Sequence, residues 1–208
     1  MTFAQRERER LGELLIEVGP DAPTLNEGWQ TRDLAAHLFI RERKPLAAAG
    51  IFVPVAKQLL DAETRKQLAR PYEDVVRQWA AGPPAALRPI DAKMNTAEHF
   101  IHHEDVRRGR GEVNPREFSA AVNKELLTWA KRFGLMAFRK AEIPVVLTPP
   151  NLPPVTLGGK AGVAERGDNV ARVSGEPGEL LLWVSGRSVA DVTLTGNTAE
   201  LEAIERGV

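Results

Sequence analysis

The chain has 208 residues, of which 43% are hydrophobic, and its 28 Lys and Arg balance its 28 Asp and Glu. This length suits one large domain or two small ones, and the zero net charge gives no basic field for nucleic acid or an acidic membrane. Cysteine is absent, which excludes disulfides, thiolate zinc sites and a cysteine nucleophile. Any thiol chemistry therefore needs an external thiol. We expect a cytoplasmic protein, because residues 1–10 are charged and no apolar stretch is long enough for a membrane span.

Helical patterns fill the first two thirds of the chain. An amphipathic pattern over residues 3–18 ends at Gly19-Pro20 and predicts the first helix. Further helices are predicted at about 31–49, 55–69, 72–81, 92–108 and 115–140. Gly134 is the point at which the last of them could break.

The composition changes at Ile143, after which five prolines break helices and residues 145–147 form a strand pattern. We therefore predict a helical domain over residues 1–142 and a small α/β domain over 143–208. In the second domain we expect a hairpin over 163–173 that turns at Gly167-Asp168, a helix at 177–185, a strand at 189–195 and a last helix from Asn197 to Gly207.

The segment from Asn95 to Asp105 holds three of the four histidines beside three carboxylates. On a helix that turns about 100° per residue, Glu98, His102 and Asp105 fall within an arc of roughly 60°, with His99 and His103 to one side. If that arc faces the interior, each unpaired polar group costs about 2–7 kcal/mol, and a charge costs more. A bound cation would be a suitable partner for these groups.

Two readings of this helix compete. Asn95 as the N-cap with Glu98 at the third helical position would occupy the glutamate in a capping box. A start at Asp91, after Pro89, gives a longer helix with Glu98 in its middle, and we favour this one. Histidines that are only solvated or hydrogen-bonded are the alternative to a metal site.

The fourth histidine, His37, falls in a second predicted helix, with Thr31 as N-cap and Asp33 in the first turn. Taken alone, it suits a core histidine that is hydrogen-bonded to Asp33. Together with Glu98 and His102 it would complete a set of three ligands and leave the fourth position for water or substrate, as in catalytic zinc sites.

The runs Gly-Trp-x-x-x-Asp-Leu-x-x-His at 28–37 and Glu-x-x-x-His-x-x-Asp at 98–105 resemble the two metal motifs of the mycothiol-dependent maleylpyruvate isomerase superfamily, which is related to the DinB-like helical bundles. Residues 98–108 are similar to a subgroup of uncharacterised actinobacterial metal-binding proteins. The resemblance implies that His37, Glu98 and His102 bind a divalent metal, commonly zinc, in a four-helix bundle. It also implies that Asp105 lies nearby and orients a ligand.

Residues 175–187 are similar to the small α/β domain, reminiscent of sterol-carrier domains, that follows the bundle in this superfamily. Members with known activity use an arginine of this domain near the thiol site, and Arg187 is the best positional match. The alternative is that Arg187 simply follows the helix stop at Gly186 and caps or pairs locally. The expected fold is therefore α+β, with an N-terminal DinB-like four-helix bundle and a C-terminal sterol-carrier-like domain.

The resemblance implies a metal-dependent enzyme that uses mycothiol as its thiol cofactor, a transferase or isomerase that acts on a small electrophilic substrate. Arg187 and Asp105 are its candidate catalytic residues. The alternatives are a non-catalytic metal- or ligand-binding protein and a metal-dependent hydrolase. A fourth protein ligand, such as Asp105 or His103, would favour a structural ion, and an open position would favour catalysis. Two imidazoles and a carboxylate also suit nickel, cobalt or iron.

Overall fold

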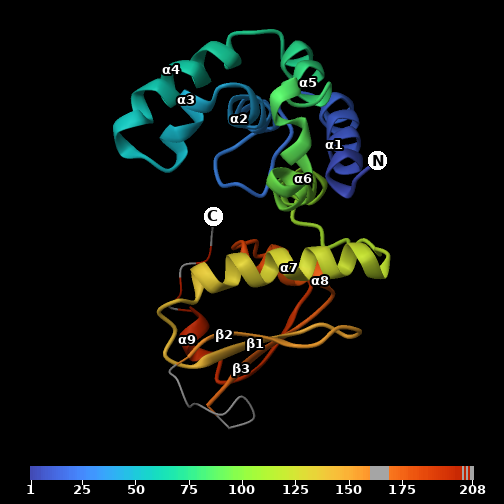
Figure 1. Ribbon diagram of the computed structural model, residues 1–208, viewed down its shortest axis with the longest axis vertical. Coiled ribbons are helices and arrows are strands. Elements are labelled where there is room, and N and C mark those ends of the chain that lie inside the picture. Colours follow the sequence, from blue (N-terminus) through green and yellow to red (C-terminus); the bar gives the residue numbers. More distant parts are fainter. Residues whose placement is uncertain (160–168, 203, 205, 207–208) are drawn as a thin grey trace. The chain divides into compact units, whose positions relative to one another are not determined.

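The computed structural model describes residues 1–159, 169–202, 204 and 206 (Figure 1). It shows an α+β protein with two compact units, Met1–Gly111 and Glu112–Val208. The first unit is helical, and the second combines helices with a four-stranded sheet. Among the described helices, none has the length and apolar character needed to cross a membrane.

The first unit is built around four helices that share one hydrophobic core. Its core side chains come from α1, α2, α5 and α6 and include Leu11, Leu15, Leu34, Leu38, Val75, Val76, Trp79 and Val106. Further helices connect α2 to α5 and α5 to α6. The complete set is α1 (Phe3–Val18), α2 (Thr31–Arg43), α3 (Pro45–Ala48), η1 (Ala49–Ile51), η2 (Pro54–Ala56), α4 (Lys57–Leu68), α5 (Tyr72–Ala80), η3 (Ala85–Ile90) and α6 (Asp91–Arg107).

The ends of α2 differ from the sequence prediction. Its N-cap is Gln30 rather than Thr31, because the Gln30 amide donates to Asp33 Oδ2 at 2.9 Å, whereas the Thr31 hydroxyl donates to the Gly19 carbonyl at 2.5 Å. The predicted single helix over 31–49 is divided at Lys44. Pro45 has no amide hydrogen and disfavours helical geometry in the residue before it, so α2 ends there and the short α3 begins.

The start of α6 confirms the longer of the two predicted helices, since it begins at Asp91 and leaves Glu98 in its middle. Its C-terminal end supports the loop between α1 and α2. The Leu25 amide donates to the Asp105 carbonyl at 3.1 Å. Gly109 allows this approach, because a Cβ at that position would overlap the Pro23 carbonyl oxygen. The loop that contains Trp29 is thereby fixed against the helix that contains Glu98.

In its described residues, the second unit consists of a mixed sheet and three helices. The sheet order is β2-β1-β3-β4, in which β1 pairs antiparallel with β2 and parallel with β3, and β3 pairs antiparallel with β4. In chain order the elements are α7 (Ala120–Ala137), β1 (Pro144–Thr148), β2 (Val155–Gly158), β3 (Ala171–Ser174), α8 (Pro177–Val184), β4 (Thr193–Gly196) and α9 (Ala199–Glu202). The predicted turn at Gly167-Asp168 and the predicted helix end at Gly207 lie outside the described residues.

Helix α7 belongs to the second unit. The two units divide between Gly111 and Glu112, and not at residue 142, where the change in composition placed the boundary. The reason is that α7 packs against α8 and β2. Gly134 does not interrupt α7 but lets it approach β2, because a Cβ at Gly134 would overlap the buried side chain of Leu157.

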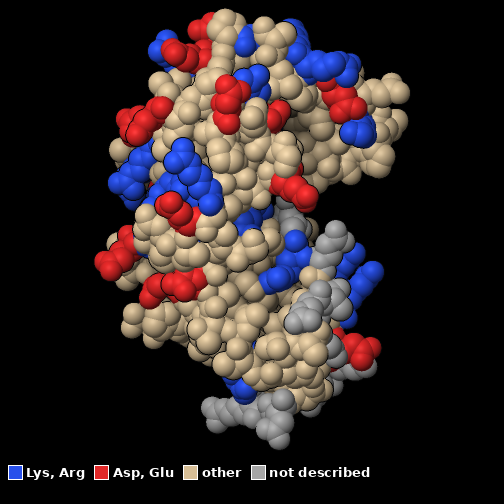
Figure 2. Space-filling model, turned by 180° about the vertical axis from the view of Figure 1, so that it is seen from behind, with Lys and Arg blue, Asp and Glu red and all other residues tan. Residues whose placement is uncertain are grey.

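Charged side chains of both signs are mixed over the face drawn in Figure 2 and do not form a field of one sign. This distribution agrees with the balanced composition of 28 basic and 28 acidic residues.

Candidate metal centre

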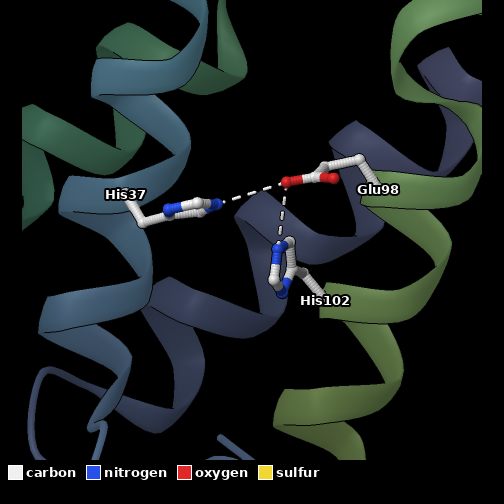
Figure 3. A group of neighbouring side chains, drawn as sticks. All are labelled: His37, Glu98 and His102. Carbon is white, nitrogen blue, oxygen red and sulfur yellow. Dashed lines mark hydrogen bonds and ion pairs between the residues drawn. The ribbon is translucent and has the colours of Figure 1, made fainter. Parts of the chain in front are cut away.

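The structure brings His37, Glu98 and His102 together between α2 and α6, as Figure 3 shows. One carboxylate oxygen, Glu98 Oε1, lies 3.2 Å from Nε2 of His37 and 3.2 Å from Nε2 of His102. The candidate ligand atoms of the three residues all lie within 4.8 Å of one another. The two α6 residues stand one turn apart, and His37 is positioned by the packing of α2.

The three side chains are partly open to solvent. His37, Glu98 and His102 expose 18%, 21% and 10% of their side chains. No fourth His, Asp or Glu from the described part of the chain joins the group. The described residues therefore supply three candidate protein ligands, one fewer than the four of a structural zinc site.

Asp105 contacts the opposite edge of the His102 ring. Its Oδ2 lies 2.9 Å from His102 Nδ1, and its side chain is fully buried. With the carboxylate as acceptor, Nδ1 carries a proton and donates it, so Nε2 is free to be the metal ligand. An unprotonated Nε2 would then direct its lone pair at Glu98 Oε1, and this contact is favourable only with a proton or a cation between the two atoms. In the metal-free protein a proton on Nε2 satisfies this contact, and a bound metal ion could take the place of that proton.

Ionisation of the group follows from its contacts. Burial lowers the pKa of His102, but the hydrogen bonds to Asp105 and Glu98 outweigh burial and raise this pKa to about 9. Burial alone would raise the pKa of Glu98, but the hydrogen bonds from both histidines hold it well below its ordinary value, with a contribution from the Arg41 charge. For His37 burial dominates over the contact with Glu98, so its pKa is lowered.

Arg41 is a member of the site that the sequence analysis missed. Its Nε lies 3.0 Å from Glu98 Oε1, Nη1 donates to Asn95 Oδ1 at 2.5 Å, and Nη2 donates to the Met94 carbonyl at 3.1 Å. The available signal was its spacing, because a residue four positions after His37 lies on the same face of α2. Arg41 was not predicted because only histidines and carboxylates were considered as members of a metal site.

Trp29 also contributes to the site. Its indole ring lies 5.3 Å from the His37 imidazole, centre to centre, at an interplanar angle of 57°. The His37 and His102 rings meet edge to face at 5.2 Å. The rings of Trp29 and His102 therefore both contact the His37 imidazole.

His99 and His103 are outside the group. His99 Nδ1 donates to the Ala4 carbonyl at 2.9 Å, and His99 Nε2 lies 3.0 Å from Glu42 Oε1. His103 Nδ1 lies 2.9 Å from Glu7 Oε2. Both histidines are buried and contact residues that α1 and α2 contribute.

A buried polar network continues from Arg41 across the interior of the first unit. Asn95 Nδ2 donates to Asp91 Oδ1 at 2.8 Å, and the same oxygen accepts from Arg8 Nη2 at 2.7 Å. Arg8 Nη1 in turn donates to Glu42 Oε2 at 2.6 Å. Burial would raise the pKa of Glu42, but the contacts with His99 and Arg8 outweigh it and lower this pKa. The network ties α1 and α2 to the helix that contains two of the ligands.

Arg187 lies in the second unit, just after α8. Its backbone amide donates to the Leu182 carbonyl at 3.0 Å, and its Nη1 donates to the Ser185 carbonyl at 2.7 Å. These contacts are those of a residue that caps the end of its own helix.

Comparison of the chain with family models, with curated proteins and with solved structures found no match. The functional conclusion therefore depends on the geometry of the site and on the resemblance of its two motifs.

Proposed function

We propose that the protein is a divalent-metal-dependent enzyme that uses an external thiol of the mycothiol type, as a transferase or isomerase acting on a small electrophile. The observation that carries the proposal is the half-open group of His37, Glu98 and His102, which offers three ligand atoms within 4.8 Å of one another. The thiol part of the proposal rests on the resemblance of residues 28–37 and 98–105 to the metal motifs of the mycothiol-dependent superfamily.

The residues have distinct tasks in this proposal. His37 Nε2, a Glu98 carboxylate oxygen and His102 Nε2 would hold the ion, with zinc as the first candidate. Asp105 would keep the His102 proton on Nδ1 through their 2.9 Å contact. A bound divalent ion lowers the pKa of a thiol or water in its fourth position and so supplies an anionic nucleophile near neutral pH.

The four core helices α1, α2, α5 and α6 would form a bundle of the DinB type, and the sheet with α7, α8 and α9 would correspond to the sterol-carrier-like domain. Arg187 remains the candidate in this proposal for a substrate carboxylate, which an arginine can bind with two hydrogen bonds.

Metal analysis of the purified protein, combined with mycothiol titration on the same samples, tests the proposal. The wild type should hold about one metal ion per chain and bind mycothiol only when the metal is present. His102→Ala should lose both properties. Glu73→Gln, a change in an exposed ion pair on α5, is the matched control and should keep them.

The outcomes separate the competing functions. Stoichiometric metal in His102→Ala would overturn the site itself. Metal in the wild type without any metal-dependent thiol binding would overturn the thiol cofactor and favour the hydrolase. Tightly held metal that admits no exogenous ligand would favour the non-catalytic binding protein.

A further inference from the structure

Arg41 places a fixed positive charge against the only carboxylate in the candidate ligand set. Its Nε lies 3.0 Å from Glu98 Oε1, and its side chain is 22% exposed. Its other described partners, Asn95 Oδ1 and the Met94 carbonyl, are uncharged oxygens. All three contacts are on α6, so the guanidinium is held in place beside the site.

The charges around the site can be counted. A divalent ion would bring two positive charges, which the carboxylates of Glu98 and Asp105 balance. Asp105 acts through His102 Nδ1 at 2.9 Å, and Glu98 acts directly as a ligand. With neutral imidazoles, the charges of the ion, Glu98 and Asp105 alone sum to zero. Arg41 makes the centre positive by one unit.

We infer that Arg41 makes this centre select an anionic ligand over a neutral one in its fourth position. The inference rests on the proposed function, because it requires an ion held by His37, Glu98 and His102. The attraction is Coulombic and acts within a half-buried site, where it is screened less than on the open surface. Arg41 is thus a residue that sets ligand specificity without being a metal ligand.

The same charge has a second, opposite consequence. Arg41 and a divalent ion repel each other, so Arg41 weakens the affinity for the metal while it strengthens the affinity of the loaded site for an anion. A purely structural residue that only fixed Glu98 would act differently. Its removal would weaken the binding of the metal, of anions and of neutral ligands together.

The test uses the full chain loaded with Co²⁺, whose visible absorption changes when an exogenous ligand binds. Azide is the anionic probe and imidazole the neutral one. In Arg41→Met we expect the azide dissociation constant to rise about tenfold or more, with imidazole changed by no more than about twofold. Arg41→Lys keeps the positive charge and should retain most of the preference for azide. Cobalt affinity in Arg41→Met should be equal to or higher than that of the wild type.

Arg43→Met is the matched control, because Arg43 is also on α2 but donates to the carbonyls of Gln78 and Gly82, away from the site. It should leave both probes unchanged. The inference is overturned if azide binding weakens equally in Arg41→Met and Arg43→Met. It is also overturned if imidazole binding weakens as much as azide binding in Arg41→Met. If Arg41→Met does not fold, equal azide preference in Arg41→Gln and Arg41→Lys overturns it instead. Failure of wild-type protein to bind Co²⁺ overturns the proposed function as well and is visible before any probe is added.

Discussion

Asp105 and Glu98 contact opposite edges of the same imidazole, with Asp105 Oδ2 2.9 Å from His102 Nδ1 and Glu98 Oε1 3.2 Å from His102 Nε2. Asp105 therefore sets the tautomer of His102, whereas Glu98 would bind the metal ion together with His102. Asp105→Ala should therefore weaken metal affinity about 10- to 100-fold, because the imidazole loses its orientation and its fixed proton. Competition with a chromophoric chelator measures the change.

Asp105→Asn is the control for this prediction, since an amide oxygen still accepts a hydrogen bond from Nδ1. It should lose less affinity than Asp105→Ala. Equal losses in the two variants would show that the negative charge of Asp105, and not its acceptor oxygen, is what matters.

The buried network should contribute strongly to stability. Arg8→Met removes the cation shared by Glu42 and Asp91, and it leaves two carboxylates in the interior without their main partner. We expect unfolding to become easier by about 3–5 kcal/mol, the range for breaking one partner of a buried ion pair. Urea unfolding followed by circular dichroism gives the value.

The exposed pair Arg77–Glu73 is the matched comparison, because 66% and 57% of its side chains are exposed. Glu73→Ala should change the free energy of unfolding by less than about 1 kcal/mol. If the two substitutions had similar effects, the network on the interior side of α6 would be energetically unimportant.

Gly109 should tolerate no side chain. A Cβ at this position would overlap the Pro23 carbonyl, which is backbone and cannot rotate away. Gly109→Ala should therefore destabilise the protein by about 1–3 kcal/mol through overpacking. Because the displaced loop contains Trp29, which contacts His37, metal affinity should fall as well. Gly111→Ala tests the opposite situation, since only backbone strain and no contact opposes a Cβ there.

Tyr72 should make stability pH-dependent in alkaline solution. Burial raises its pKa to about 12, and its hydroxyl donates to the Leu15 carbonyl at 2.8 Å. In the unfolded chain the phenol ionises near about 10. The folded state thus binds the proton more tightly, and this contribution is complete below about pH 10 and is lost as the pH rises toward 12.

Tyr72 is the only tyrosine of the chain, so its phenolate absorbance can be titrated directly. A midpoint near 10 in the folded protein would contradict the prediction. Tyr72→Phe should lack this part of the alkaline loss of stability, and comparison of its urea unfolding with that of the wild type isolates the contribution.

Helical periodicity predicted the main helices of the first unit, because it is a local property of the sequence. The grouping of His37 with Glu98 and His102 was implied by the resemblance of the two motifs, since residues 61 positions apart are not linked by any local pattern. The division of the chain could not be predicted in the same way. The apolar side of α7 gives no sign of which unit it packs against, and the prolines after Ile143 indicate the end of a helix but not the edge of a domain. Arg41 and the buried network escaped prediction because a charged residue on a helix is usually solvated, and only packing shows that Arg8 and Glu42 are buried.

The contact between Trp29 and His37 gives the protein an optical reporter of its own site. The chain has four tryptophans, and the Trp29 ring lies 5.3 Å from the ring of a candidate ligand. Paramagnetic ions such as Co²⁺ or Ni²⁺ bound at that ligand would quench the emission of this indole, and Trp29→Phe would remove the quenched component. Occupancy of the site could then be followed by fluorescence, without any label or added dye.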